Sequence, residues 1–149
     1  MKIIESLKSL LPIIYPSFYT LLSPSLDELV FLDVGDRLQA NISEAGIAIG
    51  ADIGNDKTRC EATNNHFHLF NKIREVDQEI ATEIGKTISQ NLLRSLMQAF
   101  PHKRFIVFLE VNIKDSTIIR FHQIWSGELP YLDVKQSYQS GLELFEFRA

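Results

Sequence analysis

The chain has 149 residues, a formal net charge of −4 and a sequence pI near 5.5. Hydrophobic residues make up 45% and charged residues 23%, which excludes disordered and fibrous classes and predicts one globular domain over residues 1–149. Because binding to phosphates needs clustered Lys and Arg, the acidic balance argues against a nucleic-acid partner.

A single cysteine, Cys60, excludes an internal disulfide. We interpret it as a buried thiol in a reducing compartment, which predicts a cytoplasmic protein. The apolar run over residues 10–22 is too short to span a bilayer, and Pro12 and Pro16 interrupt it. The sequence therefore predicts no membrane partner.

The first half of the chain predicts a helix followed by a β-meander. Residues 2–11 carry apolar side chains at helical spacing, and Pro12 is expected to end this helix at Leu11. A turn or short helix is expected over residues 16–22. Three strands then follow, at residues 29–34, 37–43 and 46–53. Residues 60–70 predict a fourth, less regular strand, most extended at residues 66–70.

Residues 74–100 predict one long amphipathic helix, because apolar side chains recur at every fourth position. These are Val76, Ile80, Ile84, Ile88, Leu92, Leu96 and Phe100. Gly85 lies in the middle, where it would permit a close crossing with another element, and Pro101 ends the helix.

A hairpin follows, with strands over residues 104–113 and 117–125 and a three-residue loop that sets Ile113 opposite Thr117. This register places one apolar set on the core face, namely Phe105, Val107, Leu109, Val111, Ile113, Ile119, Phe121 and Trp125. Residues 141–148 predict a last strand. The predicted fold class is thus α+β: a single domain with an antiparallel sheet, the helix over 74–100 packed on it, and an N-terminal helix.

The second face of this hairpin would carry polar groups among apolar ones, with Glu110 opposite Arg120 and Phe108 opposite His122. One interpretation is a binding site or an acid–base pair. The other is a solvated sheet face with one cross-strand ion pair. The sequence leaves both open.

Metal and cofactor chemistry find little support in the sequence. His66 and His68 are two residues apart and would point the same way on a strand, but a zinc site needs three or four ligands. They remain weak candidates for metal ligands, and no motif predicts a cofactor.

The segment that leaves the hairpin holds Trp125, Glu128 and Tyr131, and aromatic residues on loops are frequent at interfaces. The run over residues 121–131, in a small acidic α+β chain, resembles bacterial immunity proteins, which neutralise a cognate toxin. That resemblance implies a non-enzymatic protein that binds a toxin domain. It does not identify the contact residues.

We therefore expect an immunity-type inhibitor, monomeric or homodimeric, that occludes a basic toxin domain. The expected contacts are Glu110, Arg120, His122, Trp125, Glu128 and Tyr131. A small enzyme or ligand-binding protein, with a pocket containing His66, His68 and Glu110 or His122, is the first alternative. The second is a homo-oligomeric structural subunit joined through an apolar patch on the second sheet face, unless the N-terminal helix covers that patch. The patch would consist of Ile106, Phe108, Ile118 and Ile124.

Overall fold

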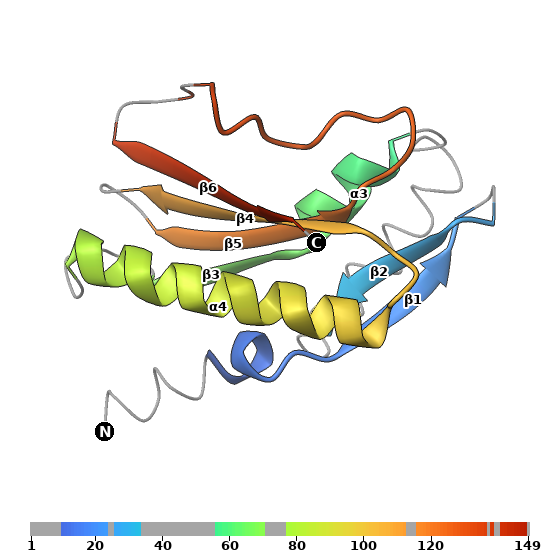
Figure 1. The fold of residues 1–149 in the computed structure, drawn as a ribbon, viewed down its shortest axis with the longest axis horizontal. Coiled ribbons are helices and arrows are strands. Elements are labelled where there is room, and N and C mark those ends of the chain that lie inside the picture. The colour runs from blue at the N-terminus through green and yellow to red at the C-terminus, as the bar shows by residue number, and fades with distance from the viewer. Residues whose placement is uncertain are drawn as a thin grey trace.

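A four-stranded antiparallel sheet and one long helix organise the computed structural model (Figure 1). The sheet contains β3 (His66–Phe70), β4 (Phe105–Asn112), β5 (Thr117–Gln123) and β6 (Leu142–Arg148), in the order β3-β5-β4-β6. The helix α4 (Gln78–Ala99) crosses one face. A separate hairpin of β1 (Phe18–Leu22) and β2 (Glu28–Leu32) lies at one end, beside the short helix α3 (Lys57–Asn64).

The structure describes residues 10–23, 26–33, 56–70, 77–112, 116–136, 138 and 141–148. The strands expected over residues 37–43 and 46–53 lie outside these ranges, as do residues 2–9 of the N-terminal helix. None of the helices within these ranges is long and apolar enough to cross a membrane.

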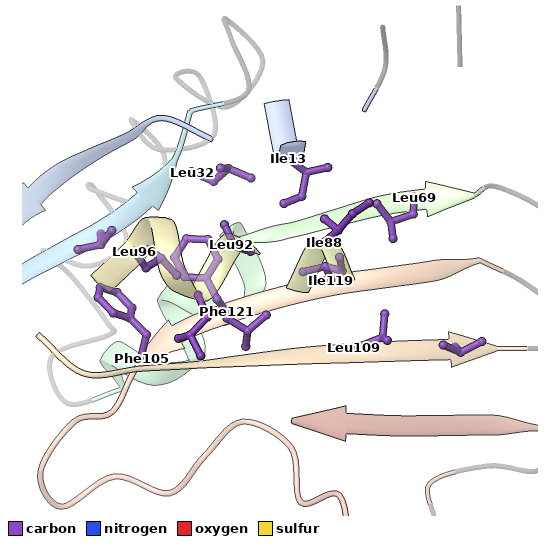
Figure 2. Close-up of a cluster of buried hydrophobic side chains, with 14 residues drawn as sticks. Ile13, Leu32, Leu69, Ile88, Leu92, Leu96, Phe105, Leu109, Ile119 and Phe121 are labelled. Carbon is purple, nitrogen blue, oxygen red and sulfur yellow. The ribbon is translucent and has the colours of Figure 1, made fainter. Parts of the chain in front are cut away.

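The main core lies between α4 and the sheet, and Figure 2 shows side chains from both meeting there. Leu92 and Leu96 of α4 face Phe105 and Phe121 of the sheet, and Ile13 closes one side. The predicted α+β class is confirmed, with the long helix packed on an antiparallel sheet.

The buried stripe of α4 differs from the predicted one in its first half. Ile80 and Ile84 are exposed, and Ala81 and Gly85 are buried in their place. A four-residue repeat drifts around a helix of 3.6 residues per turn, so a stripe that is buried at Ile88, Leu92 and Leu96 lies off the core face at Ile84 and Ile80. The close crossing at Gly85 is confirmed, since an added Cβ would stand 2.6 Å from Leu109 Cδ1.

Several expected elements need correction. Residues 10–14 are helical, so the helix does not end before Pro12. The Tyr15 N–H donates to Leu11 O (2.9 Å). Pro12 has no amide proton, and this hydrogen bond does not require one at that position. Residues 18–22, expected as a turn or helix, form β1, because their backbone pairs with β2. Residues 57–64 form α3, so the strand expected over residues 60–70 begins only at His66. Asp56 Oδ1 accepts from the Arg59 N–H at the start of this helix (3.0 Å).

The β4–β5 hairpin has the predicted faces but a register shifted by two residues. Val111, not Ile113, lies opposite Thr117, so Phe108 faces Arg120 and Glu110 faces Ile118. A shift of two leaves every side chain on its original face, so the apolar pattern could not distinguish the two registers. Trp125 does not join the α4 core, because β5 ends at Gln123.

The second sheet face is covered from within the chain. Ile106 and Phe108 are fully buried, and α3 and the segment after β5 lie over this face (Figure 1). The residues 10–14 that continue from the predicted N-terminal helix pack on the α4 side instead, where Asn91 Nδ2 donates to Ile14 O (3.1 Å). Ile106 and Phe108 therefore do not form an exposed patch for oligomerisation.

We predict that Gly85→Ala lowers the free energy of unfolding by about 1 kcal/mol. The helix gains about 1 kcal/mol from alanine, but overpacking against Leu109 costs roughly 1–3 kcal/mol. Urea denaturation measures the change. In a Leu109→Ala background the same Gly85→Ala change should raise stability, because only the helix preference remains. A stabilising Gly85→Ala in the otherwise native chain would contradict the close contact.

Candidate functional site

Two side chains at the end of α3 join the β1–β2 hairpin to the main sheet. Glu61 accepts hydrogen bonds from the Val30 N–H of β2 (2.9 Å) and from the Gln123 N–H of β5 (3.0 Å). Asn65 Oδ1 accepts from the Leu32 N–H and Asn65 Nδ2 donates to Val30 O. The two side chains therefore act in place of a strand between β2 and β5.

Glu61 is completely buried and accepts two more hydrogen bonds from side chains. Gln123 Nε2 donates to Oε2 (2.8 Å), and Trp125 Nε1 donates to Oε1 (2.6 Å). All four partner atoms are donors, so the ionised carboxylate satisfies every one of them. Burial raises the pKa of this carboxyl, and the four hydrogen bonds act against that rise.

The bond to Trp125 begins a chain of contacts that fixes the segment over residues 124–131, which we call the anchored segment. Lys57 Nζ lies 4.5 Å from the Trp125 ring centroid and 2.8 Å from Asp27 Oδ2. Glu128 Oε1 accepts from the Thr58 N–H (2.8 Å). This N–H lies in the first turn of α3, where the helix itself provides no acceptor. Trp125 also packs against the small cluster of Leu29, Phe31 and Cys60.

The other end of the anchored segment is held by His122 and Arg120. The Tyr131 N–H donates to His122 Nε2 (3.1 Å), and the Arg120 guanidinium lies 5.0 Å from the Tyr131 ring centroid. Arg120 Nε also donates to Glu110 Oε2 (2.9 Å), and one of its terminal nitrogens donates to Ala62 O (3.0 Å). The ion pair between Glu110 and Arg120 is thus present, diagonally rather than directly across the strands.

His122 is buried and held in one neutral form. Its Nδ1 lies 2.7 Å from Gln123 O, an acceptor, so Nδ1 carries the proton, and Nε2 then accepts from Tyr131. Burial lowers the pKa of His122 and outweighs the opposing effects of the Gln123 carbonyl and the Glu128 charge. Both ring nitrogens are in use, so this side chain positions the anchored segment.

The two weak metal candidates lie on the exposed edge strand β3. The His66 and His68 rings are 5.4 Å apart, with His66 Nδ1 at 2.9 Å from Thr63 O and His68 Nδ1 at 3.0 Å from Ser116 Oγ. Across the described residues, no group of three or more His, Cys, Asp or Glu side chains could hold a metal ion. Burial lowers the pKa of His66.

The Cys60 thiol lies beneath the anchored segment. It is buried, as the sequence predicted, and burial raises its pKa to about 11, with the Glu61 and Asp56 charges adding to the rise. A thiol with so high a pKa has very little thiolate at neutral pH, which is the opposite of what a nucleophile needs.

The structure brings the six predicted contact residues to the same side of the molecule, opposite α4, in two groups. Glu110, Arg120, His122 and Tyr131 form one group, and Trp125 and Glu128 meet α3 in the other. Glu61 and Asn65 were not predicted from the sequence as organising residues. The spacing i, i+4 would have placed them on one helix face, but this region was predicted as strand, which hid the pattern.

Comparison with protein-family models, curated proteins and solved structures found no match for this chain.

We predict that Glu61→Gln lowers the free energy of unfolding by about 2–4 kcal/mol. The amide nitrogen would face two of the four donors and leave them buried without an acceptor. Urea denaturation measures the loss, and Glu83→Gln on the exposed side of α4 should change stability by less than about 0.5 kcal/mol. Equal stability of both variants would contradict the role of the Glu61 carboxylate.

We predict that the free energy of unfolding decreases as pH decreases, partly because of His122. Below the unfolded-state pKa of about 6.5 the unfolded chain binds a proton that the folded ring does not. The free energy of unfolding should therefore fall as pH decreases below that value, by up to about 1.4 kcal/mol per unit for one proton. Besides Gln123 O, the charges of Glu128 and Arg148 act on this ring.

Unfolding free energies measured between neutral pH and about pH 5 test this. His122→Asn should flatten the dependence, because the variant lacks the ring that binds a proton only in the unfolded chain. An unchanged slope in His122→Asn would show that this ring does not titrate differently in the folded and unfolded states.

Proposed function

We propose that this protein is an immunity-type inhibitor that binds a bacterial toxin domain and covers its active site. The observation that carries the proposal is the anchored segment, which is fixed at both ends and exposes Leu129 between them. The Leu129 side chain is 86% exposed, and Pro130 beside it is exposed as well. A large apolar side chain held in solvent on a fixed segment is a frequent anchor of protein interfaces.

The fixed ends favour binding because little freedom is lost when a partner docks. On one side Trp125 and Glu128 bind Glu61 and the start of α3, and on the other Tyr131 binds His122. Only a short stretch lies between these contacts. A segment that is ordered before binding loses less conformational entropy on association, which raises affinity for the same contacts.

The side chains that could act as acid, base or nucleophile already form hydrogen bonds or ion pairs within the fold, or are buried. Glu61 has four hydrogen bonds, both nitrogens of His122 are bonded, and the Cys60 thiol has a raised pKa. Glu110 is paired with Arg120. These contacts favour a binding role over the alternative of an acid–base enzyme.

The proposed partner is a basic toxin domain in the bacterial cytoplasm. The net charge of −4 and the single cysteine support this choice. Asp56 and Asp133 are exposed near the two ends of the anchored segment and would face basic side chains. Complementary charge speeds association, while the apolar contact at Leu129 limits dissociation.

Within this proposal the six predicted residues divide by role. Trp125, Glu128 and Tyr131 remain half-exposed and border the contact, and Glu110 and Arg120 lie at its edge. His122 is buried and acts only through the position of Tyr131. Leu129 and Pro130 are added as the central contacts.

The test is capture of the partner by tagged protein from cultures that make the toxin, followed by an inhibition assay. The native chain should retain a basic protein at equal stoichiometry and abolish its toxic activity when added in equal amount. Leu129→Asp should weaken this binding at least tenfold, because a charge would be buried at the centre of the contact.

Leu22→Asp is the matched control, since Leu22 is also a solvent-exposed leucine (64%) but belongs to β1 and not to the anchored segment. It should bind and inhibit like the native chain. A captured protein that both variants retain equally would show that the anchored segment is not the contact. Turnover of a small molecule by the purified chain would contradict a purely inhibitory role.

A further inference from the structure

Each end of the anchored segment is held by a buried side chain that can gain a proton. At one end Glu61 Oε1 accepts from Trp125 Nε1 (2.6 Å), and at the other His122 Nε2 accepts from the Tyr131 N–H (3.1 Å). Both bonds require an unprotonated acceptor, because an added proton would occupy a lone pair that the donor uses. The two ends therefore respond in the same direction to a fall in pH.

The four donors around Glu61 occupy both of its oxygens. Oε1 accepts from Trp125 and from the Gln123 N–H (3.0 Å), while Oε2 accepts from the Val30 N–H (2.9 Å) and from Gln123 Nε2 (2.8 Å). A proton on either oxygen turns an acceptor position into a donor, so one of these bonds must break. Loss of the Trp125 bond costs least, because this ring is half-exposed and its N–H can turn to water, whereas the Val30 and Gln123 amides are buried.

The His122 ring has a single nitrogen that can accept, and the Tyr131 amide uses it. Nδ1 donates to Gln123 O (2.7 Å), so a second proton must go to Nε2. The imidazolium would then direct an N–H at the Tyr131 N–H. Two donors cannot bond to each other, so this end of the segment would move away from the ring.

Other titratable and charged groups surround the two acceptors. Near Glu61 and Trp125 they are Asp56, Lys57 and Cys60 of α3, Asp27 and Glu28 at β2, Lys103, and Arg120 of β5. Near His122, Glu128 of the segment favours the protonated ring and Arg148 of β6 opposes it, while β4 contributes the uncharged Phe108 ring. Glu128 also accepts from the Thr58 N–H, a bond that one oxygen of a neutral carboxyl can keep.

We propose that the anchored segment is an acid-sensitive switch, closed while Glu61 is ionised and His122 is neutral, and released at both ends when these two side chains gain protons. The direction follows from linkage. The Trp125 bond lowers the pKa of Glu61, so its loss on release raises that pKa and favours proton uptake. Release likewise frees His122 Nε2 to bind a proton. Each proton taken up favours release by up to about tenfold per pH unit.

The switch would regulate binding at Leu129, and in that respect it rests on the proposed function. Acid loosens the segment that presents Leu129, so a complex formed at neutral pH would dissociate in a mildly acidic medium. The release itself requires no partner. It can be measured in the isolated chain, which separates a failure of the switch from a failure of the proposed function.

Trp125 is the only tryptophan of the chain, so its fluorescence reports the Glu61 end directly. As pH is lowered from neutral, its emission should shift to longer wavelength and acrylamide should quench it more, while the far-UV circular dichroism stays unchanged. Glu61→Gln should show the released emission already at neutral pH, with no further change in acid. Asp27→Asn, which removes the carboxylate paired with Lys57 beside the same ring, should titrate like the native chain.

The His122 end has its own measurement, which is hydrogen exchange of the Tyr131 amide followed by NMR. Its protection, corrected for the intrinsic pH dependence of exchange, should fall by about tenfold or more over the pH range in which the ring gains its proton. The nitrogen-15 signal of His122 Nε2 should titrate with the same midpoint. These measurements use the native chain, so they decide the question even where Glu61→Gln does not fold.

Three outcomes would overturn the switch. Trp125 emission and Tyr131 protection could change only together with the far-UV circular dichroism, which would show that the segment is held until the whole chain unfolds. The emission of Glu61→Gln could titrate with the native midpoint, which would assign the change to another group. A change at one end alone would contradict release from both. Acid release in an isolated chain that captures no toxin would support the switch and contradict the proposed function.

Discussion

The structure depends on the hydrogen bonds that the β2 backbone makes along the edge that is not paired with β1. This edge belongs to a two-stranded hairpin that does not pair with the main sheet through its backbone, although its leucine, valine and phenylalanine side chains are buried. Buried backbone groups must find partners. Glu61 and Asn65 supply most of these partners, and Gln123 Nε2 supplies one more by donating to Glu28 O (2.8 Å). Three side chains therefore extend the sheet without adding a strand.

The same carboxylate connects the fold to the proposed contact surface. Glu61 binds Trp125, Trp125 begins the anchored segment, and this segment continues through Glu128 to Tyr131. Any change that weakens the connection between β2 and β5 should therefore also loosen the position of Leu129. If the proposed function holds, stability and partner binding are therefore coupled through the Glu61 carboxylate.

The sheet divides the molecule into regions with different roles. The α4 side holds the apolar core, where Leu109 meets Gly85 without space for another methyl group. The opposite side holds the hydrogen-bonded polar groups that position the anchored segment.

The sequence by itself determined the elements whose periodicity is complete within one segment. The long helix, the faces of the β4–β5 hairpin and β6 followed from local spacing of apolar residues. Tertiary contacts decided the rest. Residues 18–22 form a strand because β2 pairs with them, and the hairpin register depends on a shift of two that leaves the pattern unchanged. Glu61 and Asn65 acquired their roles only when β2 and β5, about thirty and sixty residues away along the chain, arrived beside them. Hydrogen bonds between groups so distant in the chain produce no periodic pattern in the sequence, whereas burial of one face of a helix or strand produces a regular spacing of apolar residues.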